Sequence, residues 1–328
     1  MHLVESHHEL PSSSELGACV HQLTVRSRPV LRALLAAAAI AAAITVAGCG
    51  GEPGASNRHM QPLSERVLAE LKAKKMEKES PILMRIFKEE SELEVWKQDD
   101  SGRFALLRTY PICRWSGELG PKFREGDRQA PEGFYTITPG LTHPNSSHYL
   151  AINTGFPNAY DRANGRTGAF LMIHGGCSSA GCYAMTDQQI AEIYALAREA
   201  FFGGQTSFQL QAYPFRMTPL NMARHRNSPH LAFWKMIKEG HDQFEVTHLE
   251  PRVGVCDKRY VFGTKSTDSF SHADRCPAYG VAEDIATPVS EKQRRDDIET
   301  ALLINRGIPT VSATTSVDGG MHPTFLRR

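Results

Sequence analysis

The stretch Leu171–Asp187, with the sequence LMIHGGCSSAGCYAMTD, decides the fold expected for this chain. It begins with an apolar run, Leu171-Met172-Ile173, which is typical of a short buried strand. After a small-residue loop, Thr186 is followed three residues later by Gln189, which is the capping-box pattern of a helix N-terminus. Apolar residues then recur at helical spacing until Gly203, a residue type that commonly ends helices. The stretch therefore predicts a strand, a polar loop and a capped helix.

Short apolar runs on both sides of this stretch predict further strands, separated by turn residues. One turn, Asp99-Asp100-Ser101-Gly102, indicates a hairpin. Strands are predicted at residues 82–87, 93–97, 104–110, 133–138, 149–153, 208–213, 244–247 and 259–262, and helices at residues 64–76 and 231–237. Strands therefore outnumber helices in the expected fold.

The composition of the chain is that of an ordinary globular protein. Its 328 residues are 41% hydrophobic and 22% charged, which allows a full apolar core. The formal net charge is +1, with 37 basic and 36 acidic residues and no long block of like charge. Bulk electrostatics therefore do not predict a nucleic-acid partner.

The N-terminal region has the order of a secretory signal. Three arginines precede an uncharged, alanine-rich run, residues 33–47, which is too short to span a bilayer comfortably as a permanent helix. The run ends in Val46-Ala47-Gly48-Cys49, which resembles the lipobox of bacterial lipoproteins. The alternatives are an ordinary signal peptide with a chance cysteine, and an uncleaved anchor. We expect a periplasmic protein lipidated at Cys49, with its anchor in the outer membrane because Gly50 stands where many inner-membrane lipoproteins carry Asp.

These features suggest a division of the chain. Residues 1–24 are an upstream extension or a mis-assigned start, and residues 25–48 are the signal peptide. Residues 49–62 form a flexible tether rich in Gly, Pro and Ser. Residues 63–265 form a catalytic domain, and residues 266–328, where apolar periodicity fades, form a poorly ordered tail.

The loop of the first stretch carries one histidine and two cysteines, His174, Cys177 and Cys182. A cysteine nucleophile needs a base, which His174 could supply, and backbone amides to hold an oxyanion. Gly181 permits the backbone angles of such a turn. The three residues could instead bind zinc, with His143 or His148 as a fourth ligand, although their spacing matches no common zinc module. Cys177 and Cys182 could also form a disulfide.

The stretch resembles the catalytic segment of the YkuD-type L,D-transpeptidase family, murein enzymes whose motif is a histidine at a strand end followed by S/T-x-G-C. His174 and the tetrad Ser179-Ala180-Gly181-Cys182 match this motif. Ala180 replaces the usual histidine, and the loop is shorter than in the commonest members; both features resemble the YafK-like branch. Segments that resemble the same branch lie at residues 85–88, 93–96, 110–122, 130–135, 156–162 and 165–168. The resemblance covers roughly residues 60–265.

The resemblance implies a mostly β, α+β fold, curved and β-sandwich-like with a few peripheral helices. It also implies a cofactor-free enzyme in which Cys182 forms a thioester at the diaminopimelate of peptidoglycan stem peptides. An amine would resolve the thioester in cross-linking or protein attachment, and water would resolve it in the release of a peptidoglycan-linked outer-membrane lipoprotein. Non-catalytic binding of peptidoglycan by a lipoprotein is the alternative function.

Several residues receive roles under this interpretation. His174 is the base, the Gly175 carbonyl orients its ring, and the amides of Gly181, Cys182 and Tyr183 form an oxyanion hole. The candidate carboxylate-binding residues are Arg114, Lys122 and Arg166. The candidate groove residues are Ser179, Tyr183 and Tyr149. Cys256 and Cys276 are a candidate disulfide; Cys113 and Cys177 stay unassigned, with Cys177 expected to be a small buried side chain rather than a partner of Cys182.

Overall fold

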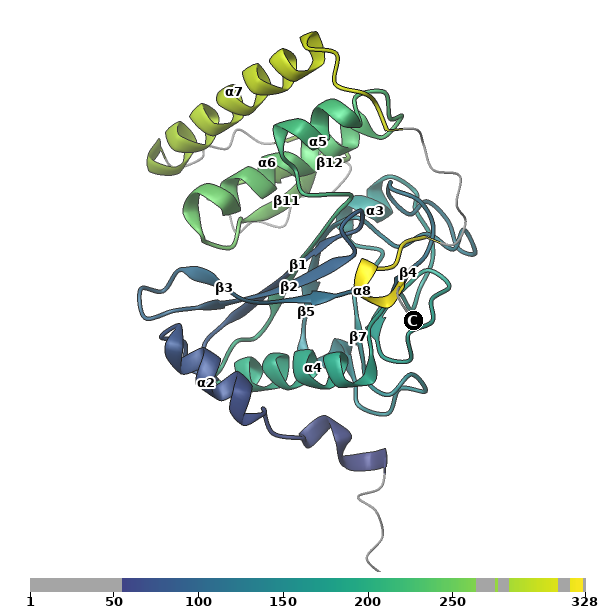
Figure 1. Cartoon of the computed structure of the whole chain (residues 1–328), viewed down its shortest axis with the longest axis vertical. Coiled ribbons are helices and arrows are strands. Elements are labelled where there is room, and N and C mark those ends of the chain that lie inside the picture. Colours follow the sequence, from purple (N-terminus) through teal and green to yellow (C-terminus); the bar gives the residue numbers. More distant parts are fainter. Residues whose placement is uncertain (1–54, 264–274, 277–282, 312–318, 327–328) are drawn as a thin grey trace, which may run out of the picture. The chain divides into compact units, whose positions relative to one another are not determined.

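Two five-stranded sheets form the centre of the structure, a computed structural model that describes residues 55–263, 275–276, 283–311 and 319–326 (Figure 1). The first sheet contains, in spatial order, β3 (Phe104–Pro111), β2 (Glu92–Gln98), β1 (Ile82–Phe87), β10 (Phe208–Tyr213) and β5 (Gly133–Ile137). The second contains β4 (Arg114–Trp115), β9 (Tyr183–Ala184), β8 (Met172–His174), β7 (Ala151–Asn153) and β6 (Thr142–His143). A separate hairpin pairs β11 (Val253–Cys256) with β12 (Arg259–Phe262).

Helices surround the sheets, and the described ones belong with the strands to one compact unit. They are η1 (Ala55–Met60), α2 (Glu65–Ala73), η2 (Pro139–Leu141), α3 (Ala159–Ala163), α4 (Asp187–Phe202), α5 (Pro219–Arg224), α6 (Leu231–Thr247), α7 (Glu283–Asn305) and α8 (Pro323–Leu326). None of these helices is both long enough and apolar enough to cross a membrane. The α+β class with several sheets is confirmed.

The first sheet is buried on both faces, and the two faces differ in chemistry. Alternate residues of β1, such as Met84 and Ile86, point into an apolar core that also contains residues of α4 and of the second sheet. The alternating residues of the same strand, Arg85 and Phe87, point to the opposite face. Figure 1 shows α4 on one side of this sheet and α6 on the other. The predicted capping box of α4 is confirmed, because Thr186 and Gln189 exchange hydrogen bonds.

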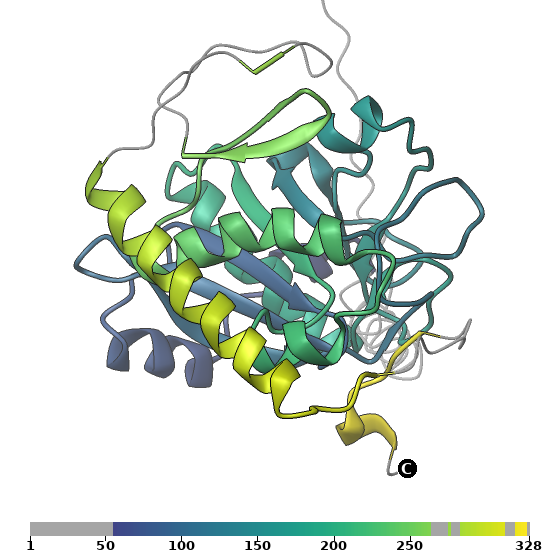
Figure 2. The same ribbon diagram turned by 90° about the horizontal axis from the view of Figure 1, so that it is seen from above.

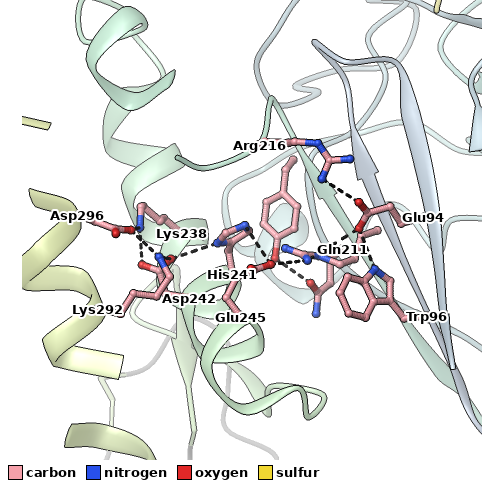
Figure 3. Close-up of polar contacts among 12 residues, drawn as sticks. Glu94, Trp96, Gln211, Arg216, Lys238, His241, Asp242, Glu245, Lys292 and Asp296 are labelled. Carbon is pink, nitrogen blue, oxygen red and sulfur yellow. Dashed lines mark hydrogen bonds and ion pairs between the residues drawn. The ribbon is translucent and has the colours of Figure 1, made fainter. Parts of the chain in front are cut away.

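The face of the first sheet toward α6 carries a polar network (Figure 3). At one end, Glu94 of β2 accepts hydrogen bonds from Trp96 Nε1 and from Arg216, each at 2.8 Å. At the other end, Lys238 Nζ of α6 lies 2.6 Å from Asp242 and 2.6 Å from Asp296 of α7. These charged contacts tie α7 to α6, and α7 also lies against α5, as Figure 2 shows from above.

The helix α7 corrects the expectation of a poorly ordered tail over residues 266–328. Its apolar residues Ile285, Val289 and Ile304 face a cavity that is shared with Met222 of α5 and Leu231 of α6. Charged residues stand between these apolar positions, so the segment is polar on average and no helix was predicted there. The remaining part of the predicted tail is described only at residues 275–276, 306–311 and 319–326.

The structure contradicts one further prediction in part and another entirely. The predicted tether, residues 49–62, contains η1, and Arg198 of α4 donates hydrogen bonds to the carbonyls of His59 and Gln61, so its described end is ordered.

The strand predicted at residues 244–247 is the last turn of α6. Phe244 packs edge-on against Trp96, with ring centroids 5.1 Å apart, and a short apolar run does not distinguish a strand from a buried helix.

A fully buried ion pair joins the first sheet to the segment between β4 and β5. Lys88, which directly follows β1, lies 2.9 Å from Glu132 Oε1, and both side chains have no exposed surface. The ammonium also donates to the carbonyls of Glu118, Gly120 and Ala130. Glu132 in turn accepts hydrogen bonds from Gly120 N and Trp234 Nε1. The pair therefore fixes the connection of residues 116–132, which reaches the candidate site described below.

We predict that Lys88→Met lowers the free energy of unfolding by about 3–5 kcal/mol, because it leaves the Glu132 carboxylate buried without a counter-charge. Urea denaturation measures this loss. Adding Glu132→Gln should recover part of it, since the amide is neutral. Lys75→Met is the control: Lys75 is 75% exposed beside Asp100, so its loss should cost less than about 1 kcal/mol. Equal losses for the two lysine variants would contradict the prediction.

Candidate functional site

The register of β8 and β9 places His174 and Cys182 on one face of the second sheet. The two strands run parallel, and His174 pairs with Ala184. Because alternate side chains of a strand share a face, Cys182, two residues before Ala184, lies on the same face as His174. Both side chains line one cavity of about 750 Å³. The sheet therefore brings together the two residues to which the sequence analysis gave the chemistry.

The sulfur of Cys182 is a free thiol that is partly exposed to solvent. It lies 3.7 Å from the carbonyl oxygen of Phe170, to which it donates, and accepts from the Met172 amide at 3.4 Å. These contacts go to backbone rather than to the imidazole of His174. Burial raises the pKa of the thiol, and the Met172 amide and the charge of Lys122 oppose this effect. The thiol is therefore neutral at neutral pH in this state.

The imidazole of His174 is oriented by the carbonyl of the next residue. Its Nδ1 lies 2.6 Å from the Gly175 oxygen, so a proton on Nδ1 donates to that carbonyl and leaves a lone pair on Nε2. Burial lowers the pKa of His174, and the neighbouring His148 lowers it further, against the effect of the Gly175 carbonyl. The ring of His148 lies beside it, with centroids 4.6 Å apart and the two planes tilted by 33°. A neutral imidazole of this tautomer can accept a proton from a thiol.

Only glycine fits at position 175. A Cβ there would lie 2.4 Å from Asp187 Oδ1 and 2.8 Å from the His148 carbonyl oxygen. The Gly175 amide donates to that same carbonyl at 3.0 Å. The backbone directly after His174 is thus held by close packing as well as by hydrogen bonds.

The side chain of Ser179 organises the turn before the sulfur. Its Oγ accepts from the amide of Cys182 at 3.0 Å and from the amide of Gly181 at 3.3 Å, and it donates to the Cys182 carbonyl at 2.8 Å. Gly181 has φ +131°, which favours glycine. Two of the three amides expected in an oxyanion hole, those of Gly181 and Cys182, therefore bond to Ser179 here. An oxyanion would have to compete with that hydroxyl for them.

A disulfide joins the loop before Cys182 to the core. Cys177 is bonded to Cys113, with Cα atoms 5.3 Å apart. Cys113 is fully buried, whereas Cys177 is exposed, so the expectation of a small buried side chain at position 177 is wrong. The bond leaves no thiolate at Cys177 for a metal. In the parts of the chain that the structure describes, no group of three His, Cys, Asp or Glu residues could hold a metal ion.

The cations expected to bind substrate carboxylates do not line the cavity. Lys122 is 4% exposed and forms an ion pair with Asp127. Arg166 is 8% exposed and lies 2.8 Å from Asp161. Arg114 is half-buried on β4, at the edge of the second sheet. Each of the first two has a carboxylate partner within the chain, and neither is free for a substrate.

The remaining predicted residues also have mainly structural positions. Tyr183 is buried, and its hydroxyl donates to the Pro131 carbonyl at 2.6 Å, so it does not line a groove. Tyr149 packs against the apolar core, beside Arg58. Cys256 and Cys276 form a disulfide with Cα atoms 5.0 Å apart. Cys49, the lipobox and the signal segment lie outside the described residues.

Other residues that line the cavity were not predicted to bind substrate, although His143 and His148 were considered as zinc ligands. Arg128 and Phe170 are exposed on its wall, and His143 and His148 contribute two imidazoles. Phe170 is 75% exposed and has φ +57°, a strained conformation for a bulky residue. These residues lie far apart in the sequence, and no local pattern connects them with Cys182.

Comparison with known proteins gives consistent relatives. The family model of the YkuD L,D-transpeptidase catalytic domain matches residues 86–203. The "Putative L,D-transpeptidase YafK" of Escherichia coli strain K12 is 50% identical over 182 residues, which cover 56% of this chain and 74% of that protein. The protein of the same name from Escherichia coli O157:H7 matches equally.

Weaker likenesses link the chain to solved structures. One is a mutant of the helical cell shape determining protein Pgp2 from Campylobacter jejuni, with a TM-score of 0.35, 22% identity, and coverage of 50% of this chain and 58% of that one. Another is Bd1075 of Bdellovibrio bacteriovorus, with a TM-score of 0.29, 21% identity, and coverage of 42% and 49%. The chain thus spans only about half of each solved chain.

We predict that iodoacetamide alkylates Cys182 slowly at neutral pH, with a rate that rises through a pH above the ordinary cysteine range of about 8.5. The reason is the sign of the shift: burial disfavours the thiolate, so the folded protein must reach a higher pH to populate it. Mass spectrometry of the labelled peptide measures the rate, and Cys182→Ala gives the background. Fast labelling that is already maximal at pH 6 would instead reveal a preformed thiolate and imidazolium pair.

Proposed function

The chain belongs to the YkuD L,D-transpeptidase family, and from this premise we propose that it acts on peptidoglycan stem peptides through a thioester on Cys182. The observation that carries the proposal is the arrangement in one cavity of a free thiol and a histidine with a basic Nε2. The 50% identity to a relative that is covered over 74% of its length supports the family chemistry. The diaminopimelate carbonyl is the proposed acceptor of the sulfur.

The first half of the reaction exchanges an amide for a thioester. The Cys182 sulfur adds to the carbonyl carbon while His174 Nε2 takes the thiol proton. The tetrahedral intermediate then collapses, the carbon–nitrogen bond breaks, and His174 returns the proton to the leaving amine. The Gly175 carbonyl stabilises the imidazolium through Nδ1 during this step. The thiol contacts with Phe170 and Met172 must loosen as the substrate enters, as is usual for sites that tighten only on binding.

The second half of the reaction resolves the thioester. A water molecule or an amine attacks the same carbon, gives its proton to His174 Nε2, and displaces the sulfur, which regains that proton. With water as the attacking group the net outcome is release: a linked protein, such as an outer-membrane lipoprotein, has already left as the amine in the first half, and water frees the stem peptide as a carboxylate. An amine forms a cross-link or attaches a protein. The same two side chains serve both outcomes, and access of the second substrate decides between them.

A second candidate function is non-catalytic binding of peptidoglycan. It is favoured by one observation, which is that the sulfur bonds to backbone rather than to the imidazole. A binding protein could retain the cavity without using the thiol. The experiment on Cys182 below separates the two functions.

We also propose a periplasmic location with a lipid anchor at Cys49 in the outer membrane. The signal-like order of the N-terminal sequence motivates this location. Two disulfides, between Cys113 and Cys177 and between Cys256 and Cys276, support an oxidising compartment.

We predict that Cys182→Ala abolishes product formation from lipoprotein-bearing sacculi and from tetrapeptide muropeptides, and that His174→Gln lowers the rate about 10²- to 10⁴-fold. Mass spectrometry of the products measures both effects and shows whether water or an amine is used. His248→Asn, at the C-terminal end of α6 and outside the cavity, is the matched control and should keep full activity. If the parent protein and Cys182→Ala bound sacculi equally and neither formed product, the binding function would replace the enzymatic one.

We predict that Cys49→Ala moves the protein from the outer-membrane fraction to the soluble periplasm or leaves it as an unprocessed precursor. The reason is that the substitution removes the only thiol at the proposed cleavage position. Membrane fractionation with immunoblotting measures the distribution. Unchanged membrane association and processing in the variant would contradict the lipid anchor.

A further inference from the structure

The loop that contains Arg128 has a fixed shape. Asp127 accepts hydrogen bonds from the backbone amides of Phe123, Arg124 and Gln129, all at 2.9–3.0 Å. Its carboxylate also forms an ion pair with Lys122. This internal bracing holds Arg128 in the left-handed region at φ +56°, where non-glycine residues are uncommon. Such a conformation persists when the surrounding contacts over-determine it, and it is frequent at ligand sites.

Arg128 lies directly against the turn that presents the nucleophile. A Cβ at Gly181 would be 3.8 Å from the Cα of Arg128 and 3.7 Å from its carbonyl carbon. Arg128 is thus packed beside the residue that precedes Cys182, and its side chain lines the cavity that contains the sulfur. A peptide whose carbonyl is held at Cys182 would therefore occupy the same cavity that Arg128 lines.

Within the described structure, no carboxylate pairs with Arg128. The other two candidate cations already have carboxylate partners, since Lys122 pairs with Asp127 and Arg166 pairs with Asp161. No Asp or Glu is among the described residues that line the cavity, whereas His143 and His148 are. An exposed arginine that forms no ion pair, on the wall of a cavity that no described Asp or Glu lines, favours an anion from outside the chain.

We propose that Arg128 binds a carboxylate of the acyl-donor peptide and thereby selects substrates with a free carboxylate beside the attacked bond. The inference deepens the proposed function and rests on it. The planar guanidinium can hold a carboxylate with two parallel hydrogen bonds, which fixes orientation as well as supplying attraction. Arg128 is in this sense a specificity-determining residue, distinct from the thiol and the imidazole that carry out bond exchange.

The test compares two muropeptides, one with free stem-peptide carboxylates and one in which they are amidated. Arg128→Gln should raise KM for the free form about ten- to hundred-fold with little change in kcat, because one charge-assisted interaction is lost from both the ground state and the transition state. It should leave KM for the amidated form unchanged. Arg128→Lys should give a smaller rise, since the charge remains but the paired geometry is lost.

Arg124→Gln is the matched control. Arg124 is exposed on the same loop, four residues earlier, and does not line the cavity, so its loss should leave both KM values unchanged. If the parent protein is active and Arg128→Gln behaves like Arg124→Gln on both muropeptides, the inference fails and the proposed function stands.

A binding measurement separates the two proposals when no turnover is seen. Isothermal titration calorimetry with Cys182→Ala protein measures the affinity for the same two muropeptides, with and without Arg128→Gln. Binding of the free form that depends on Arg128, without turnover by the parent protein, would support the carboxylate site and overturn the catalytic proposal. Binding that is independent of Arg128, or absent, would overturn the carboxylate site.

Discussion

The buried ion pair between Lys88 and Glu132 is the contact on which the candidate site depends. Both side chains are fully buried, and together they fix several backbone groups of residues 116–132 beside the first sheet. The same connection contacts the turn before Cys182, because Ser116 donates to Ser179 at 2.8 Å. It also carries Arg128 to the wall of the cavity. Two charges with no access to water are therefore part of the framework that positions groups around the sulfur.

Much of the secondary structure could be predicted because it depends on local patterns. The strands β1 and β10 and the capped start of α4 follow directly from apolar runs and the Thr186 and Gln189 pair. The prediction failed at residues 244–247, where packing of Phe244 on Trp96 extends a helix, and at α7, whose contacts with α5 and α6 are distant in sequence. Tertiary packing determines the secondary structure of both segments, and a local sequence pattern carries no information on such contacts.

The candidate site, too, could be predicted from the sequence only in part. His174 and Cys182 could be located because a strand end and a small-residue turn are local features. Cations that could bind a substrate could not be located in this way, since a charged residue in the sequence does not reveal its partner. Lys122 and Arg166 are paired with Asp127 and Asp161, whereas Arg128 forms no ion pair within the described structure and lines the cavity.

The disulfide between Cys113 and Cys177 has a consequence for how a working thiol is preserved during oxidative folding. The two described disulfides do not interleave along the chain. Both cysteines of the first bond, Cys113 and Cys177, precede Cys182, and both cysteines of the second, Cys256 and Cys276, follow it. A chain that emerges N-terminus first can thus form its earlier disulfide before Cys182 emerges. The cysteine nearest to Cys182 in sequence is then already bonded to Cys113, which removes one partner with which Cys182 could mispair.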